Sequence, residues 1–165
     1  MFKPKSRIIS CLQLALVILT AGLTHASETP HAIPFKAAFV ADEVATFDGP
    51  LHFTVEGEGE GQATHLGRFT ATLHREGFVV DASLIASYEF TAANGDKLFV
   101  ESAGQADLSV PDVHVVETGT VTGGTGRFEG ATGTIAIERV VTFTGPTTDT
   151  TTHVMEGTIV LPNGN

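Results

Sequence analysis

The chain has 165 residues, 42% of them apolar, and a formal net charge of −10 at pH 7. This length and apolar content are typical of one folded domain with its own core and exclude an intrinsically disordered chain. The excess of acidic residues repels phosphate backbones, so nucleic acid is not an expected partner.

The first 26 residues have the pattern of a secretory signal peptide. Lys3, Lys5 and Arg7 precede a mostly apolar stretch at 8–23, and small residues at Thr24 and Ala26 precede the break. The alternative is an N-terminal membrane anchor, although the apolar stretch is shorter than the ~20 residues of a spanning helix. We therefore expect a secreted or periplasmic protein that makes no membrane contact after cleavage.

Cleavage would also change the chemistry available to the mature chain. It removes the only cysteine, Cys11, and leaves six basic against nineteen acidic residues, a net charge of −13. The six remaining histidines show none of the spacings that place two imidazoles on one face for zinc. We expect no disulfide, no metal and no cofactor.

Residues 27–34 are expected to form a lead-in tail, 35–161 a β domain, and 162–165 a C-terminal tail. The β domain alternates apolar and polar residues with period two, and it lacks a sustained 3.6-residue apolar stripe. Seven to nine antiparallel strands of this kind form a barrel or a sandwich. The many small inward residues favour the barrel, so the expected fold is all-β, a single small antiparallel barrel of about eight strands.

Two glycine patterns locate bends and turns within this domain. Gly57, Gly59 and Gly61 alternate with acidic residues, which predicts close backbone approach on the inward face. Asn94-Gly95 lies between two β-prone runs and predicts a tight hairpin.

The segment 120–134 holds five of the eighteen glycines. It has no lysine for a P-loop, and its spacing, with strands on both sides, does not match a dinucleotide-binding fingerprint. We interpret it as a barrel-closing loop in which Phe128 plugs one end and Arg127 pairs with a carboxylate. The residues of this structural loop are Gly123, Gly124, Gly126, Arg127, Phe128, Gly130 and Gly133.

Three titratable side chains share a strand face with apolar residues and are therefore candidates for acid/base catalysis: His65, Glu117 and Glu156. The structural alternative is that His65 is a hydrogen-bonded core residue, while an acid pairs with Arg139 to hold the barrel together. Ligand-binding candidates are the other residues placed inward by alternation, although Tyr88 is equally explained by ordinary packing. They are Phe69, Tyr88, Phe99, Glu101 and Arg139.

The run Gly123-Gly-Thr-Gly-Arg-Phe128, followed by Gly130-Ala-Thr-Gly133, resembles the glycine-rich signature of the allene oxide cyclase-like and dirigent-like β-barrels. The stretch 90–96 is similar to the central hairpin of secreted bacterial relatives. The resemblance covers 34–161 and implies an eight-stranded, calycin-like barrel with a lumen for an apolar small molecule, assembled as a dimer or trimer. Plant members close rings or steer radical coupling, but no position here matches their catalytic residues.

These observations lead to three hypotheses. The first is a secreted or periplasmic barrel that binds an apolar small molecule in its lumen, with catalysis left open. The second is an isomerase or cyclase resembling allene oxide cyclase, with acid/base residues inside the barrel. The third is a structural or interaction protein that uses its acidic exterior.

Overall fold

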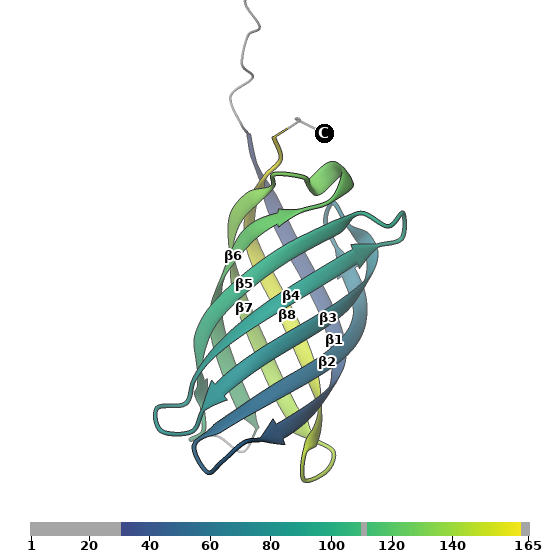
Figure 1. Ribbon diagram of the computed structural model, residues 1–165. Coiled ribbons are helices and arrows are strands. Elements are labelled where there is room, and N and C mark those ends of the chain that lie inside the picture. The colour runs from purple at the N-terminus through teal and green to yellow at the C-terminus, as the bar shows by residue number, and fades with distance from the viewer. Residues whose placement is uncertain (1–30, 110–111, 163–165) are drawn as a thin grey trace, which may run out of the picture.

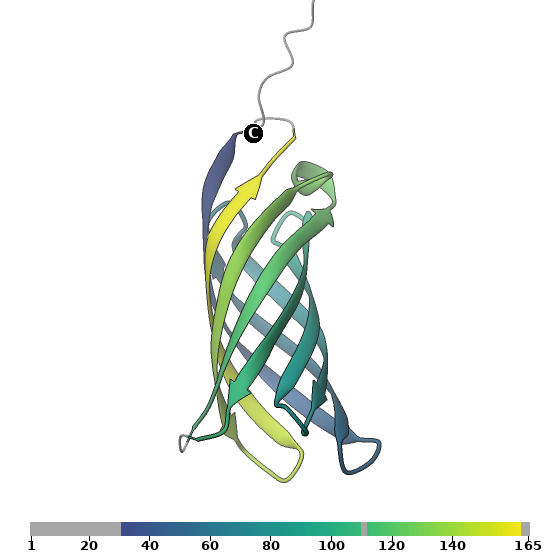
Figure 2. The same cartoon turned by 90° about the vertical axis from the view of Figure 1, so that its left-hand side faces the viewer.

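The computed structural model describes residues 31–109 and 112–162; the predicted signal peptide lies outside the described residues. Eight antiparallel strands pair in sequence order and β1 also pairs with β8, which closes the barrel (Figures 1 and 2). The prediction of an all-β barrel of eight strands is confirmed. The strands are β1 (Ala32–Phe47), β2 (His52–Ala63), β3 (Gly67–Phe78), β4 (Ser83–Ala92), β5 (Lys97–Asp107), β6 (Val113–Gly124), β7 (Thr132–Phe143) and β8 (Thr148–Val160).

Strand alternation decides which side chains enter the lumen. In β1, every second residue from Phe35 to Glu43 is buried, and the residues between them are exposed. β1 begins at Ala32, so the last residues of the expected lead-in tail belong to this strand. Pro34 is tolerated there because it lies close to the start of the strand.

Small residues let β1 and β2 approach closely. A Cβ built on Gly61 would overlap the backbone of β1 at Ala38 and Phe39, and Gly59 is similarly crowded by Ala41. The predicted close approach along the glycine run is therefore present, and it allows the wall to curve tightly.

One end of the barrel is closed by side chains and by the segment after β6. The 3₁₀ helix η1 (Gly126–Phe128) places Phe128 at full burial. Arg127 Nε lies 3.5 Å from Asp96 in the β4–β5 turn. Gly126 has φ +59, and any side chain on it would overlap the Asp96 carboxylate, so this turn requires glycine.

An apolar core fills the lumen from the closed end to about its middle. Phe39, Phe69 and Phe90 meet edge to face, with ring centroids 5.2–5.7 Å apart. Beyond them the lumen contains charged side chains, and beyond those it opens to solvent at the end formed by the β1–β2, β3–β4, β5–β6 and β7–β8 turns. The open space in the lumen is therefore confined to one end of the barrel. In the described part of the chain, no helix is long and apolar enough to cross a bilayer.

Candidate functional site

The open end of the barrel contains a cavity of about 270 Å³, which we call the mouth cavity. Its wall consists mainly of aliphatic and aromatic side chains from seven strands and the turns beside them. Its deep end is formed by Glu43, Arg75, Arg139 and Asp149. The wall residues that the structure brings together include Phe47, Phe53, Val55, Phe78, Val79, Leu84, Leu108, Val113, Val115, Val141 and Phe143.

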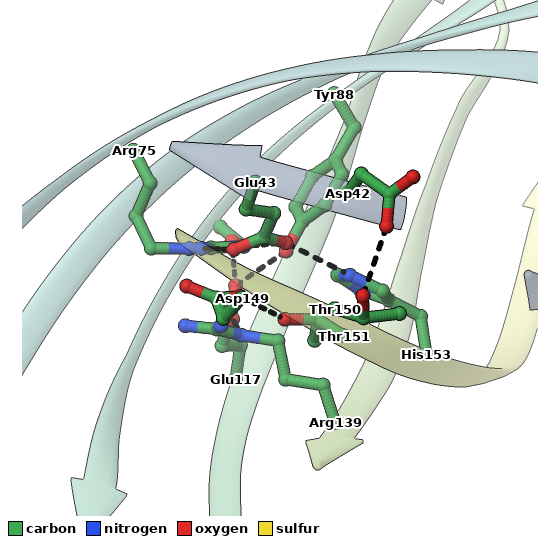
Figure 3. Close-up of polar contacts among 11 residues, drawn as sticks. Asp42, Glu43, Arg75, Tyr88, Glu117, Arg139, Asp149, Thr150, Thr151 and His153 are labelled. Atoms are coloured by element: carbon green, nitrogen blue, oxygen red, sulfur yellow. Dashed lines mark hydrogen bonds and ion pairs between the residues drawn. The ribbon is translucent and has the colours of Figure 1, made fainter. Parts of the chain in front are cut away.

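The first group at the deep end is built on Glu43 (Figure 3). Arg75 Nη1 donates to Glu43 Oε2 at 2.7 Å, and His153 Nε2 lies 3.3 Å from Glu43 Oε1. All three side chains are buried, and His153 stacks on Phe39 with ring centroids 4.1 Å apart. Burial raises the pKa of Glu43, but the His153 hydrogen bond and the Arg75 charge lower it by more, so that the resulting pKa is about 2. Glu43 is therefore a carboxylate at neutral pH.

The second group is built on Glu117. Arg139 Nε donates to its Oε1 at 2.6 Å, and the Tyr88 hydroxyl donates to its Oε2 at 3.1 Å (Figure 3). The Ser102 hydroxyl also donates to Oε2. Burial raises the pKa of Glu117, whereas Arg139 and Arg75 lower it below its ordinary value. Burial raises the pKa of Tyr88 to about 12, so its hydroxyl remains a donor. Gly104 lies against Glu117, and a Cβ there would overlap it.

Asp149 differs from the other two acids because, within the described residues, it faces the cavity without a salt bridge; the Arg75 and Arg139 charges act on it only from a longer distance. Its carboxylate accepts a 2.8 Å hydrogen bond from the Thr151 hydroxyl (Figure 3). Burial raises the pKa of Asp149 above its ordinary value, and the Glu43 charge adds to this. Asp149 is thus the acid in the cavity that gains a proton most readily.

Among the described residues, two buried side-chain nitrogens have no hydrogen-bond partner, Arg75 Nε and His153 Nδ1. Burial lowers the pKa of His153, so the imidazole is neutral. If Nε2 carries the proton donated to Glu43, Nδ1 is an unused acceptor. The charged side chains at the deep end are therefore held in place by hydrogen bonds, but part of their hydrogen-bonding capacity is unused.

The residues predicted from the sequence fall into two sets. Glu117, Arg139, Tyr88 and Phe69 lie inside the barrel. Among these four, only Arg139 lines the mouth cavity. Glu117 and Tyr88 lie behind Arg139, and Phe69 belongs to the packed core. Their proposed roles in catalysis or binding stay predictions.

The inward placement of His65 and Glu156 is wrong. His65 lies in the β2–β3 turn with φ 66 and is exposed, and its Nε2 lies 3.1 Å from the Pro34 carbonyl oxygen. The turn interrupts the alternation that appeared to join His65 to Phe69. Glu156 is on the outer face of β8, where it pairs with Lys36 at 2.9 Å.

The inward placement of Phe99 and Glu101 is also wrong, for a different reason. The inner face of β5 carries Leu98, Val100 and Ser102, so the two candidates face outward. β5 carries apolar residues on both faces at this point, and a one-residue shift in register exchanges the faces.

Sequence reasoning missed Glu43, Arg75, Asp149 and His153. Glu43 and Arg75 continue the inward alternation of β1 and β3, two residues beyond Ala41 and Leu73, so tracing both strands to their ends would have found them. His153 and Asp149 lie on the inner face of β8, opposite to the face chosen from Val154 and Val160. Within 31–109 and 112–162, no group of three or more His, Cys, Asp or Glu side chains is arranged to hold a metal ion.

The sequence matches no protein-family model and no curated protein. A solved structure of a pterocarpan synthase dirigent protein superposes on this barrel with a TM-score of 0.52 and 12% sequence identity. The alignment covers 81% of this chain and 93% of that one. At this identity the similarity shows the fold alone: this chain and that dirigent protein share the same barrel architecture.

Proposed function

We propose that this protein binds a small, largely apolar molecule in the mouth cavity. The observation that carries the proposal is an open cavity of about 270 Å³ whose wall is apolar and whose deep end has a few convergent polar groups. Small-molecule sites in proteins combine these features, at volumes of roughly 300–1,000 Å³. A barrel that served only as a structural element would gain stability by filling this space.

The test is to fill the cavity and measure binding of an apolar fluorescent dye, N-phenyl-naphthylamine. Ala106 lines the cavity, whereas Ala136 is on the outer face of β7. We expect Ala106→Phe to abolish dye binding and Ala136→Phe to leave it unchanged, with circular dichroism showing that both variants are folded. Equal binding by the two variants would exclude the mouth cavity as the site. Native mass spectrometry of protein purified from its own host would then show whether a ligand is retained.

A second candidate function is acid/base catalysis on the bound molecule, as in an isomerase or cyclase of the allene oxide cyclase kind. One observation favours it: Asp149 faces the cavity, its pKa is raised, and Arg139 also lines the cavity. An acid of this kind can exchange a proton with a ligand. Asp149→Asn should abolish turnover of any substrate found while dye binding persists. Retained turnover would exclude Asp149 as the acid/base.

We also propose that the protein is exported, because residues 1–26 carry the basic front, apolar stretch and small residues of a signal peptide. The intact mass of the protein from its host distinguishes cleavage after Ala26 from a retained anchor. The same sample on size-exclusion chromatography with light scattering tests the expected dimer or trimer.

A further inference from the structure

The charged and the apolar residues of the mouth cavity lie at opposite ends of it. The charged groups Glu43, Arg75, Arg139 and Asp149 are all at the deep end, and all are buried. The wall between them and solvent is apolar. A ligand with one polar end and one apolar end therefore matches the cavity only when its polar end lies at the deep end and its apolar end contacts the wall.

The apolar surface continues beyond the cavity onto the rim of the barrel. We call this rim surface the collar: large apolar side chains at the ends of β1, β3 and β7 and in the turns that follow β1, β3 and β5, each 40–75% exposed. Several of them also line the cavity, so wall and collar form one continuous surface. The collar residues are Phe47, Leu51, Phe78, Val79, Val80, Leu108 and Phe143.

The hydrogen bonds left open at the deep end indicate the polar group that fits there. In the described part of the chain, Arg139 donates only through Nε, which leaves its Nη atoms for a ligand acceptor. Within 31–109 and 112–162, the Asp149 carboxylate accepts only from the Thr151 hydroxyl, which leaves carboxylate oxygen for a ligand donor. A group that carries a donor beside an acceptor satisfies both residues.

The charges around the cavity select against an anionic head group. Two arginines oppose three acids, Glu43, Glu117 and Asp149, in and behind the deep end. Asp48, Asp81 and Asp107 add exposed carboxylates at the mouth turns. A carboxylate ligand would meet an excess of negative charge both on entry and when bound.

Building on the proposed function, we infer that the ligand is a neutral amphiphile, such as an aliphatic primary amide or alcohol, bound with its head group at Arg139 and Asp149. Its apolar tail points outward and continues onto the collar. The deep end of the cavity thus determines which head group binds, whereas the collar determines how many methylenes of the tail are buried.

The first test is a titration of decanamide, decanol, decanoate and decylamine at pH 7, below their micelle concentrations, by displacement of N-phenyl-naphthylamine. We expect the amide and the alcohol to bind about tenfold more tightly than decanoate, which meets the excess of acids, and than decylamine, whose ammonium would lie against Arg139 and Arg75. Binding that is indifferent to the head group, or tightest for decanoate or for decylamine, overturns the inference while leaving the cavity site intact. Failure of the dye itself to bind would instead contradict the proposed function.

The second test measures the contribution of the collar. From octanamide through decanamide to dodecanamide, affinity should rise by about fourfold for each methylene that the collar covers. Leu108→Ser and Phe143→Ser should flatten this increase. Val116→Ser is the matched control, because Val116 is as exposed as Leu108, at 63%, but lies on the outer wall. An unchanged increase in both collar variants contradicts a tail-out ligand.

The third test reports orientation directly. The chain has no tryptophan, so Phe143→Trp introduces a single fluorophore at the collar. An alkyl amide with a nitroxide at its terminal carbon should quench this tryptophan more than the same amide labelled beside the head group. The reverse order would show that the head group points outward.

Discussion

Removing Glu117 is expected to destabilise the barrel more than removing Glu117 and Arg139 together. Glu117 is the common acceptor for Arg139, Tyr88 and Ser102, and both members of the ion pair are buried. Glu117→Leu leaves the Arg139 cation without its partner, at a cost of about 3–5 kcal/mol. Arg139 also borders the solvent-accessible mouth cavity, which places the expected cost toward the lower end of that range.

Replacing both partners removes the uncompensated charge. Glu117→Leu/Arg139→Met keeps apolar volume in the lumen and leaves only the Tyr88 and Ser102 hydroxyls without their acceptor, a loss of about 1–3 kcal/mol. The coupling energy of the double-mutant cycle should therefore reach at least ~2 kcal/mol. The assay is urea unfolding at pH 7, with the exposed Glu138→Gln on β7 as control. A single-mutant cost below about 1 kcal/mol, or strictly additive costs, would refute the reasoning.

Three further predictions concern stability. The pKa of Glu43 is lowered to about 2 in the folded state, so its contribution to stability is present above pH ~4.5 and is lost as the pH falls toward 2. The free energy of unfolding should therefore drop by roughly 3 kcal/mol between these two pH values. Urea unfolding at a series of pH values measures this drop, and Glu43→Gln should reduce it. Gly61→Ala should lower the melting temperature more than Gly67→Ala does, because a Cβ on Gly61 would overlap the backbone of β1. Gly67 has φ +69, which costs an alanine some backbone strain, but the space around it is open. Equal shifts in melting temperature would contradict the close approach of β1 and β2. Tyr88→Phe should cost about 1 kcal/mol in urea unfolding, and no measurable cost would mean that its bond to Glu117 is replaceable.

The fold was accessible from the sequence because its main determinant is local. Three local patterns predict strands and turns that the tertiary contacts leave in place: the period-two alternation, the Asn94-Gly95 turn and the glycine-rich segment. In β6 and β7 one face is clearly apolar, so Glu117 and Arg139 could be assigned to the lumen, although the sequence left both Glu117 and Glu156 open as the partner of Arg139.

The site was less accessible because part of it depends on strand register. In β8, Val154 and Val160 made the outer face resemble a core face, which hid His153. In the β2–β3 turn, His65 appeared to continue a strand that ends at Ala63. The position at which polar side chains enter the lumen also depends on all eight strands together, and no single segment encodes it.

Closure of the barrel has a consequence for the order of folding. β1 pairs with β8 along its length, with Ala32 opposite Val160, so the first and last strands of the barrel share one seam. Until β8 is available, a growing chain holds two unpaired edges, and the final pairing spans nearly the whole domain. Such non-local pairing is slow, and open edges associate with other chains. We expect a chain ending before Thr148 to aggregate and the full chain to gain its protected state in a late step, which pulse-labelling hydrogen exchange on β1 would detect.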